Sequence, residues 1–196
     1  AVWEDWMRGI PWYQGRSQYT SYHPWLPEAA SSLNYDVSAW DTSSVRDMNG
    51  MFMGQRSFNR PIGGWCVDEV IFMCDMFRGA ESFNQPIGDW KVDNVLNMHD
   101  MFNGAKSFNR GIGDWRVDKV WNMGCMFLEA KAFNQPIGNW RVDKVAEMKS
   151  MFQAAQKFNQ PLGDWRVDNV DDMSHMFWCA KSFNQPIASW NVSNVR

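Results

Sequence analysis

Residues 133–152 decide the fold, and they run Phe133-Asn-Gln-Pro-Ile-Gly-Asn-Trp140-Arg-Val-Asp-Lys-Val-Ala-Glu-Met-Lys-Ser-Met-Phe152. Nearly the same text returns every 25 residues in both directions. Seven tryptophans mark the series without an insertion or deletion: Trp40, Trp65, Trp90, Trp115, Trp140, Trp165 and Trp190. Self-similarity at a fixed period of this length is typical of a solenoid, in which each repeat is one coil stacked on the last.

Two shorter periodicities lie within each repeat. Apolar and polar residues alternate over 163–168, which predicts a strand with one buried face. The apolar residues over 170–180 then follow at spacings of three, three, one and three, which predicts a short helix with Asp168 as its N-cap. We therefore expect an α/β repeat fold, a leucine-rich-repeat-like solenoid with short parallel strands on one side and short helices on the other.

The period divides the chain into two parts. Residues 1–32 stand outside it, are rich in aromatics and contain three prolines, so we expect an N-terminal cap or an arm that docks on a neighbour. Residues 33–196 form the solenoid of 25-residue repeats, which ends in mid-repeat at Arg196. Because a solenoid needs a polar cap on its last coil, we expect either further chain or a protein partner at this uncapped C-terminal coil.

The repeat also carries a family resemblance. The pattern Trp-x-Val-x-x-Val-x-x-Met-x-x-Met-Phe-x-x-Ala-x-x-Phe-Asn-Gln-Pro-Ile resembles the BspA-type surface-protein repeat over about residues 33–195. That family occurs in mycoplasma lipoproteins, lactobacillar surface proteins and unicellular algae. The resemblance implies a leucine-rich-repeat-type solenoid that binds other proteins, often at a cell surface, and it brings no shared catalytic residues.

Composition excludes some classes of function. The net charge is −3 with acidic and basic residues nearly balanced, which disfavours a general nucleic-acid binder. No run of eighteen apolar residues is present, so we expect no transmembrane segment. The four cysteines occupy four different repeat positions; free thiols are the favoured interpretation, with a Cys66–Cys74 disulfide left open.

Three groups of polar residues are candidate sites. One is a column of asparagines, expected to be structural and to satisfy backbone groups of adjacent coils: Asn59, Asn84, Asn109, Asn134, Asn159 and Asn184. A basic ladder beginning at Lys91 is flanked by acidic columns and should be neutralised by them. The pairs Cys74-Asp75 and His99-Asp100 share two columns of adjacent coils and could bind a metal or form a nucleophile with its base, but no supporting motif accompanies them. We therefore expect no catalytic residue, no metal and no cofactor.

Apolar residues that break the repeat are more informative. On the predicted helix face that points away from the core, two columns carry the apolar residues Ile71, Leu96, Trp121, Leu128 and Trp178. A contiguous apolar patch in water usually marks an interface, although the N-terminal segment could also cover it. We favour a protein partner bound there, with Trp121 as the anchor.

Together these features favour a non-catalytic protein–protein interaction scaffold, an accessory or structural subunit of a larger protein assembly, for which an organellar complex of an alga is one setting. The alternative is an extracellular or cell-surface adhesin or receptor module. The compartment stays open between an organelle lumen or surface and the extracellular surface.

Overall fold

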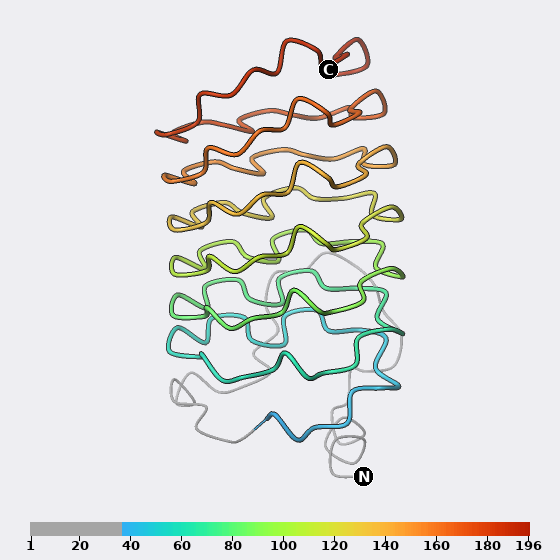
Figure 1. Cartoon of the computed structure of the whole chain (residues 1–196), viewed down its shortest axis with the longest axis vertical. Coiled ribbons are helices and arrows are strands. Elements are labelled where there is room, and N and C mark those ends of the chain that lie inside the picture. Colours follow the sequence, from blue (N-terminus) through green and yellow to red (C-terminus); the bar gives the residue numbers. More distant parts are fainter. Residues whose placement is uncertain (1–36) are drawn as a thin grey trace.

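The computed structural model describes residues 37–196 and winds them into coils of 25 residues that are stacked along one axis (Figure 1). We call residues that occupy the same place in successive coils, 25 positions apart, a column. Backbone N–H groups donate to carbonyls of the neighbouring coil, as in Phe77 N to Met101 O at 2.9 Å and Phe102 N to Met126 O at 2.9 Å. The stack is therefore tied together along its whole described length. The expected N-terminal cap or arm, residues 1–32, lies outside the described residues.

The predicted secondary structure is wrong. Residues 37–196 contain no helix, and their only β-type pairing is a series of isolated parallel bridges between adjacent coils. The strand expected over 163–168 and the helix expected over 170–180 are turns and irregular backbone, so the chain is not an α/β leucine-rich-repeat-like fold. The bridges join one column, which we call the bridge column: Asp47, Phe72, Asn97, Asn122, Glu147 and Asp172.

Alternating hydrogen bonds replace the helix. In the segment 73–80, the N–H groups of Met73, Asp75 and Phe77 donate to the next coil, at Asn97 O, His99 O and Met101 O. The N–H groups of Met76, Arg78 and Ala80 close tight turns within the coil, as in Arg78 N to Asp75 O at 3.0 Å. An α-helix would need every N–H to bond four residues back. Here half of these donors serve the neighbouring coil instead.

Left-handed backbone at two positions of each coil produces these turns. One column has φ between 53° and 61° and contains Gly50, Asp75, Asp100, Cys125, Ser150 and His175. The other has φ between 54° and 74° and contains Gly54, Gly79, Gly104, Glu129, Ala154 and Cys179. A residue in this conformation interrupts a right-handed helix, so Asp168 and its counterparts have no helix to cap.

The core consists of aromatic and aliphatic columns, and the expectation that the repeat tryptophans face inward is confirmed. Trp90, Trp115 and Trp140 are each 3% exposed, and their rings stack with centroids 6.5 Å apart. Two phenylalanine columns run beside them, with Phe102 and Phe108 stacked at 4.1 Å. Each buried indole also donates from Nε1 to a carbonyl 28 residues earlier, as Trp115 does to Ile87 O at 3.1 Å, so its polar atom is satisfied.

Glycine precedes five of the repeat tryptophans, Trp65, Trp90, Trp115, Trp140 and Trp165, by two residues. The positive-φ glycines lie at other positions of the coil, namely Gly50, Gly54, Gly79 and Gly104. A Cβ added at Gly113 would instead lie 2.6 Å from Pro136 O in the next coil. Close approach of the next coil therefore leaves no room for a side chain at Gly113.

The asparagine column links the coils at another corner of the stack. The side-chain Oδ1 of Asn84 accepts the backbone N–H of Asn109 at 3.0 Å, and Asn109 Oδ1 accepts that of Asn134 at 2.9 Å. The same bond recurs from Asn59 to Asn184, and glutamine side chains such as Gln135 reinforce it. Each asparagine thus satisfies a backbone donor that the corner leaves without a carbonyl partner.

Candidate functional site

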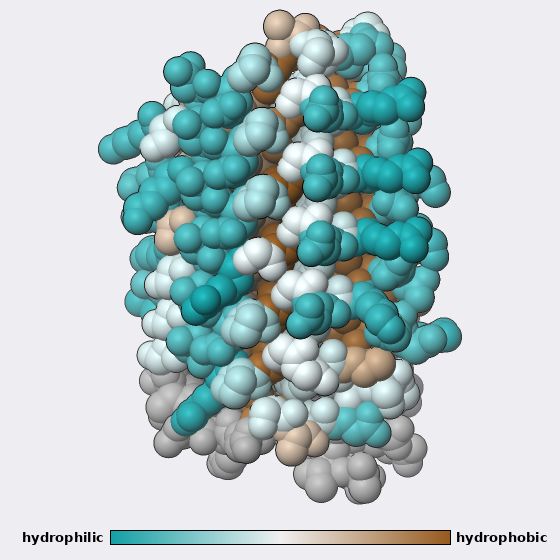
Figure 2. Space-filling model, viewed as in Figure 1, coloured by the Kyte–Doolittle hydropathy of each residue, from teal (hydrophilic) through white to brown (hydrophobic). Residues whose placement is uncertain are grey.

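Hydrophilic side chains repeat from coil to coil on both sides of a paler, partly apolar central band on the face that Figure 2 shows. The basic ladder is neutralised by its neighbours: Arg116 lies 3.3 Å from Asp93 and 3.5 Å from Asp118, and Arg166 lies 3.5 Å from Asp143. Lys91 and Arg141 have similar exposed pairs. Because the charges are paired along the stack, this ladder gives no net basic stripe for a polyanion.

A row of apolar side chains interrupts this hydrophilic pattern. Ile71, Leu96 and Trp121 succeed one another in a single column, and their backbones are joined by Leu96 N to Ile71 O at 2.9 Å and Trp121 N to Leu96 O at 3.0 Å. Trp121 is 43% exposed, and Ile71 and Leu96 are half-buried. We call these three residues the apolar row. Elsewhere the same column carries Arg46, Ala146 and Asp171, so nothing in the repeat itself requires an apolar residue here.

Phe72 was missed from the sequence, although it is 40% exposed and adjoins Ile71 in the chain. Every other member of the bridge column accepts the backbone N–H two residues ahead, as Asn97 Oδ1 does from His99 N at 2.9 Å. Phe72 has no acceptor, and Asn49 Oδ1 of the preceding coil accepts Cys74 N instead at 2.7 Å. An aromatic residue in a column of acceptors is therefore the signal that could have found it.

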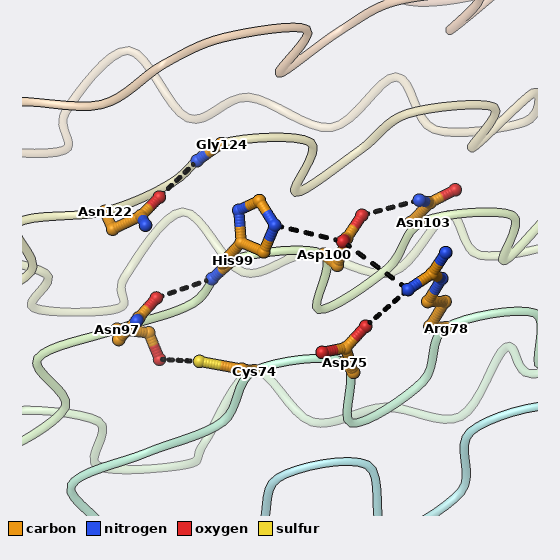
Figure 3. Close-up of polar contacts among 9 residues, drawn as sticks. All are labelled: Cys74, Asp75, Arg78, Asn97, His99, Asp100, Asn103, Asn122 and Gly124. Atoms are coloured by element: carbon orange, nitrogen blue, oxygen red, sulfur yellow. Dashed lines mark hydrogen bonds and ion pairs between the residues drawn. The ribbon is translucent and has the colours of Figure 1, made fainter. Parts of the chain in front are cut away.

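Leu128 and Trp178 lie in a different part of the coil from the apolar row. Both occupy the column of Arg78 and Asn103, which Figure 3 shows across a group of polar side chains from Asn97 and Asn122 of the bridge column. Trp178 is 60% exposed, and its ring meets His175 edge-on at 6.0 Å. The predicted patch was built on helical geometry, and without the helix its two columns are separated.

A polar cluster of seven residues extends from beside the bridge column to the column of Arg78 and Asn103, and it contains Cys74, Asp75, Arg78, His99, Asp100, Asn103 and Cys125. His99 Nε2 lies 3.1 Å from Asp100 Oδ2. Arg78 joins the coils, because its Nη1 lies 3.1 Å from Asp75 Oδ1 and 3.8 Å from Asp100 Oδ2 (Figure 3). Asn103 Nδ2 donates to Asp100 Oδ1. The Asp100 side chain, only 10% exposed, is thus held from three directions.

These contacts set the protonation of the cluster. A hydrogen bond to Asp100 raises the pKa of the His99 imidazole, although burial works against it. Burial alone would raise the pKa of Asp100, but the hydrogen bonds from His99 and Asn103 lower it. Burial raises the pKa of the Cys74 thiol to about 12 and that of Cys125 to about 11. His99 and Asp100 therefore favour an ion pair, while both cysteines are neutral thiols at physiological pH.

One nitrogen of His99 is left without a partner. Its Nδ1 is buried and makes no hydrogen bond. A Cβ added at Gly124 would lie 3.0 Å from it, so the absence of a side chain at Gly124 makes room for the imidazole. Cys74 Sγ points elsewhere, toward Asn97 O at 3.9 Å. The sequence predicted that His99-Asp100 would lie beside Cys74-Asp75 but missed Cys125, which follows Asp100 in its own column one coil on.

Stacked coils with the same side chains at the same places define a repeat protein. The chain belongs to the family described as Mycoplasma protein of unknown function, DUF285, whose model matches residues 25–128 and 104–196. The mycoplasma-type repeat expected from the motif is confirmed at this level. No curated protein and no solved structure matches the chain. The described residues include no helix long and apolar enough to cross a membrane.

Proposed function

We propose that this chain is a non-catalytic protein-interaction scaffold and that a protein partner binds at the apolar row Ile71, Leu96 and Trp121. The observation that carries the proposal is the 43% exposure of Trp121 in a column that elsewhere holds Arg46 and Asp171. A strictly repeated fold tolerates variation only where a side chain does not pack within the stack. Three consecutive coils nevertheless carry apolar side chains at this column, and an exposed apolar patch of this kind usually marks a surface that contacts another protein.

Neighbouring residues support this interface. Phe72, 40% exposed, extends the apolar surface beside Ile71. Trp121, the anchor of the proposed interface, is of a residue type that is enriched among the energetically dominant residues of protein interfaces. The finer resemblance to BspA-type repeats, which implies binding to other proteins, agrees with the proposal.

The polar cluster supports the proposal that the chain has no catalytic role. A nucleophilic cysteine needs a thiolate, whereas burial raises the pKa of Cys74 to about 12 and that of Cys125 to about 11. His99 Nε2 is engaged by Asp100 and is not directed at a thiol as a base would be. The cluster therefore has the components of a catalytic pair without an activated nucleophile.

A site-specific crosslinker would test the proposed interface. Photoreactive benzoylphenylalanine replaces Trp121 in one variant and Arg116 of the same coil in the control, and both are expressed in cells of the organism that makes the protein. We expect one dominant protein adduct from position 121 and none from position 116. Adducts at both positions, or at neither, would contradict the proposal.

A second pair of variants separates binding from folding. Leu96→Ser with Trp121→Ser should leave the melting temperature within a few degrees of the parent, because neither side chain belongs to the buried core cluster. The same variant, carrying the crosslinker at Ile71, should lose the adduct that the crosslinker at Ile71 gives in the parent background. A fall of many degrees would mean that these residues stabilise the stack instead.

A further inference from the structure

The polar cluster brings together three different kinds of metal ligand. Among residues 37–196, His99, Asp100 and Cys125 each offer one donor atom, and these atoms all lie within 4.8 Å of one another. Two of the residues are consecutive in one coil, and the third comes from the next coil. The left-handed backbone at Asp100 (φ 57°) and Cys125 (φ 56°) gives both side chains the same direction from their coils.

We propose that His99, Asp100 and Cys125 bind a single divalent ion of the zinc type, contrary to the expectation from the sequence that the chain holds no metal. Imidazole nitrogen, carboxylate oxygen and thiolate sulfur together suit zinc, whereas magnesium and calcium prefer oxygen ligands alone. Three protein ligands leave a fourth tetrahedral position for water or for a donor from a partner.

The charges around the site balance such an ion. When zinc binds, it displaces the proton shared by His99 and Asp100 and the proton of the Cys125 thiol. One thiolate and one carboxylate then offset its two positive charges. Arg78, whose Nη1 lies 3.8 Å from Asp100 Oδ2, is itself paired with Asp75 at 3.1 Å, so its charge is compensated within the cluster.

Supporting contacts already orient the ligands. Asn103 and Arg78 hold the Asp100 carboxylate, and Asn97 Oδ1 fixes the backbone of His99 at 2.9 Å. Such outer contacts are characteristic of metal sites. Zinc–ligand bonds place tetrahedral donors about 3.3–3.8 Å apart, so the widest separation must shorten on binding. Rotation about the Cα–Cβ bond of Cys125, which is half-buried, can supply this movement.

Cobalt titration provides the test, because a cobalt thiolate absorbs in the near ultraviolet where the other ligands do not. The full chain is treated with a chelator, reduced with a phosphine and titrated with Co²⁺ and then Zn²⁺. We expect one Co²⁺ per chain, a charge-transfer band and displacement of the band by zinc. Zinc should also raise the melting temperature of the parent.

The columns themselves provide variants that the fold accepts. Cys125→Ser and Asp100→Ser copy Ser150 of their own column, and His99→Ser copies Ser174. We expect Cys125→Ser to abolish the band and each of the three to weaken zinc binding at least tenfold. The control Cys74→Ser, also copying Ser174, should keep the band, and so should Cys179→Ser.

Three results would overturn the site. They are the absence of a band in the parent, a band that survives in Cys125→Ser, and a band lost in Cys74→Ser. Near-ultraviolet circular dichroism of each metal-free variant shows whether the aromatic core is intact. If Cys125→Ser has an altered core, Cys125→Ala replaces it, because alanine is smaller and has no donor atom.

Discussion

At the scale of the residue, the buried tryptophan serves two purposes. Trp115 fills the core between the rings of Trp90 and Trp140, and its Nε1 donates to Ile87 O at 3.1 Å. The packing is apolar, while the hydrogen bond joins one coil to the preceding one. These two contributions can be separated by choice of substitution.

Trp115→Ala should lower the free energy of unfolding by about 3–5 kcal/mol, because it leaves a cavity and an unpaired carbonyl. Trp115→Phe keeps much of the volume but still loses the bond to Ile87 O, so we expect a smaller loss, by about 1–3 kcal/mol. Urea unfolding followed by circular dichroism measures both. Equal losses would mean that the ring volume retained by Phe contributes nothing separate, and an unchanged stability of Trp115→Phe would mean that the hydrogen bond contributes nothing.

The need for glycine is equally local, and two glycines of one coil, Gly113 and Gly111, show the contrast. A Cβ at Gly113 would lie 2.6 Å from Pro136 O, whereas one at Gly111 would meet nothing within 4 Å. Gly113→Ala should therefore destabilise by about 1–3 kcal/mol through overpacking. Gly111→Ala should be neutral or stabilising by up to about 1 kcal/mol, because it restricts the unfolded chain. Thermal melts of the pair give the answer, and a neutral Gly113→Ala would show that the coils can separate without cost.

At the scale of the element, the segment over 73–83 explains where sequence reasoning succeeded and failed. The 25-residue period correctly predicted that Met73, Met76 and Phe77 face inward, because identical buried residues recur in every coil. The spacing of three, three, one and three equally fits tight turns that direct Met73, Met76, Phe77 and Ala80 to the core. Gly79 and Gly104, one residue before the end of their expected helices, lie at positive φ and interrupt them.

The candidate site was predictable to the same extent. Column arithmetic placed His99-Asp100 beside Cys74-Asp75, because stacking brings equivalent positions together. The partnership of Asp100 with Cys125 depends on the left-handed backbone that aims both side chains. A period alone carries no information on that direction. For the same reason, the separation of Leu128 from the apolar row could not be predicted.

The bridge column offers a test of its acceptors by pH. Burial raises the pKa of Glu147, whose Oε1 accepts Lys149 N at 2.8 Å. A pKa raised on folding costs stability above the folded pKa and nothing below the unfolded pKa of about 4.3. Glu147→Gln retains an acceptor, so at pH 7 it should stabilise by less than about 1 kcal/mol, since the carboxyl is partly exposed. The gain should disappear below about pH 4.

Asp172→Asn in the same column is the control with the opposite sign. The side chain and backbone of Ser174 lower the pKa of Asp172, so its charge stabilises the folded state above the unfolded pKa. Asn should therefore destabilise at pH 7, and the loss should shrink as the pH falls through the folded pKa. Urea unfolding at several pH values measures both variants. Changes of the same sign in the two would contradict the assignment.

At the scale of the whole molecule, stability is shared between neighbours. Every bridge and every backbone bond between coils joins one coil to the adjacent one, as between Phe77 and Met101 or Phe102 and Met126. Such a stack resembles a one-dimensional array, in which total stability is a sum over coils and their interfaces. Because the period never changes, any internal coil presents the same two surfaces as its neighbours.

Removal of one whole coil should consequently leave a folded protein. Deletion of residues 138–162 joins Ile137 to Gly163, which restores the Ile-Gly-x-Trp sequence and places Trp165 where Trp140 stacked on Trp115. The shortened chain should show the same near-ultraviolet circular dichroism, a lower melting temperature and a weaker dependence of unfolding on urea, since less surface is exposed. Deletion of only 138–149 puts every later column out of phase and should prevent cooperative folding of the residues that follow. If the whole-coil deletion also fails to fold, contacts beyond adjacent coils hold the molecule together, and the additive description of its stability is wrong.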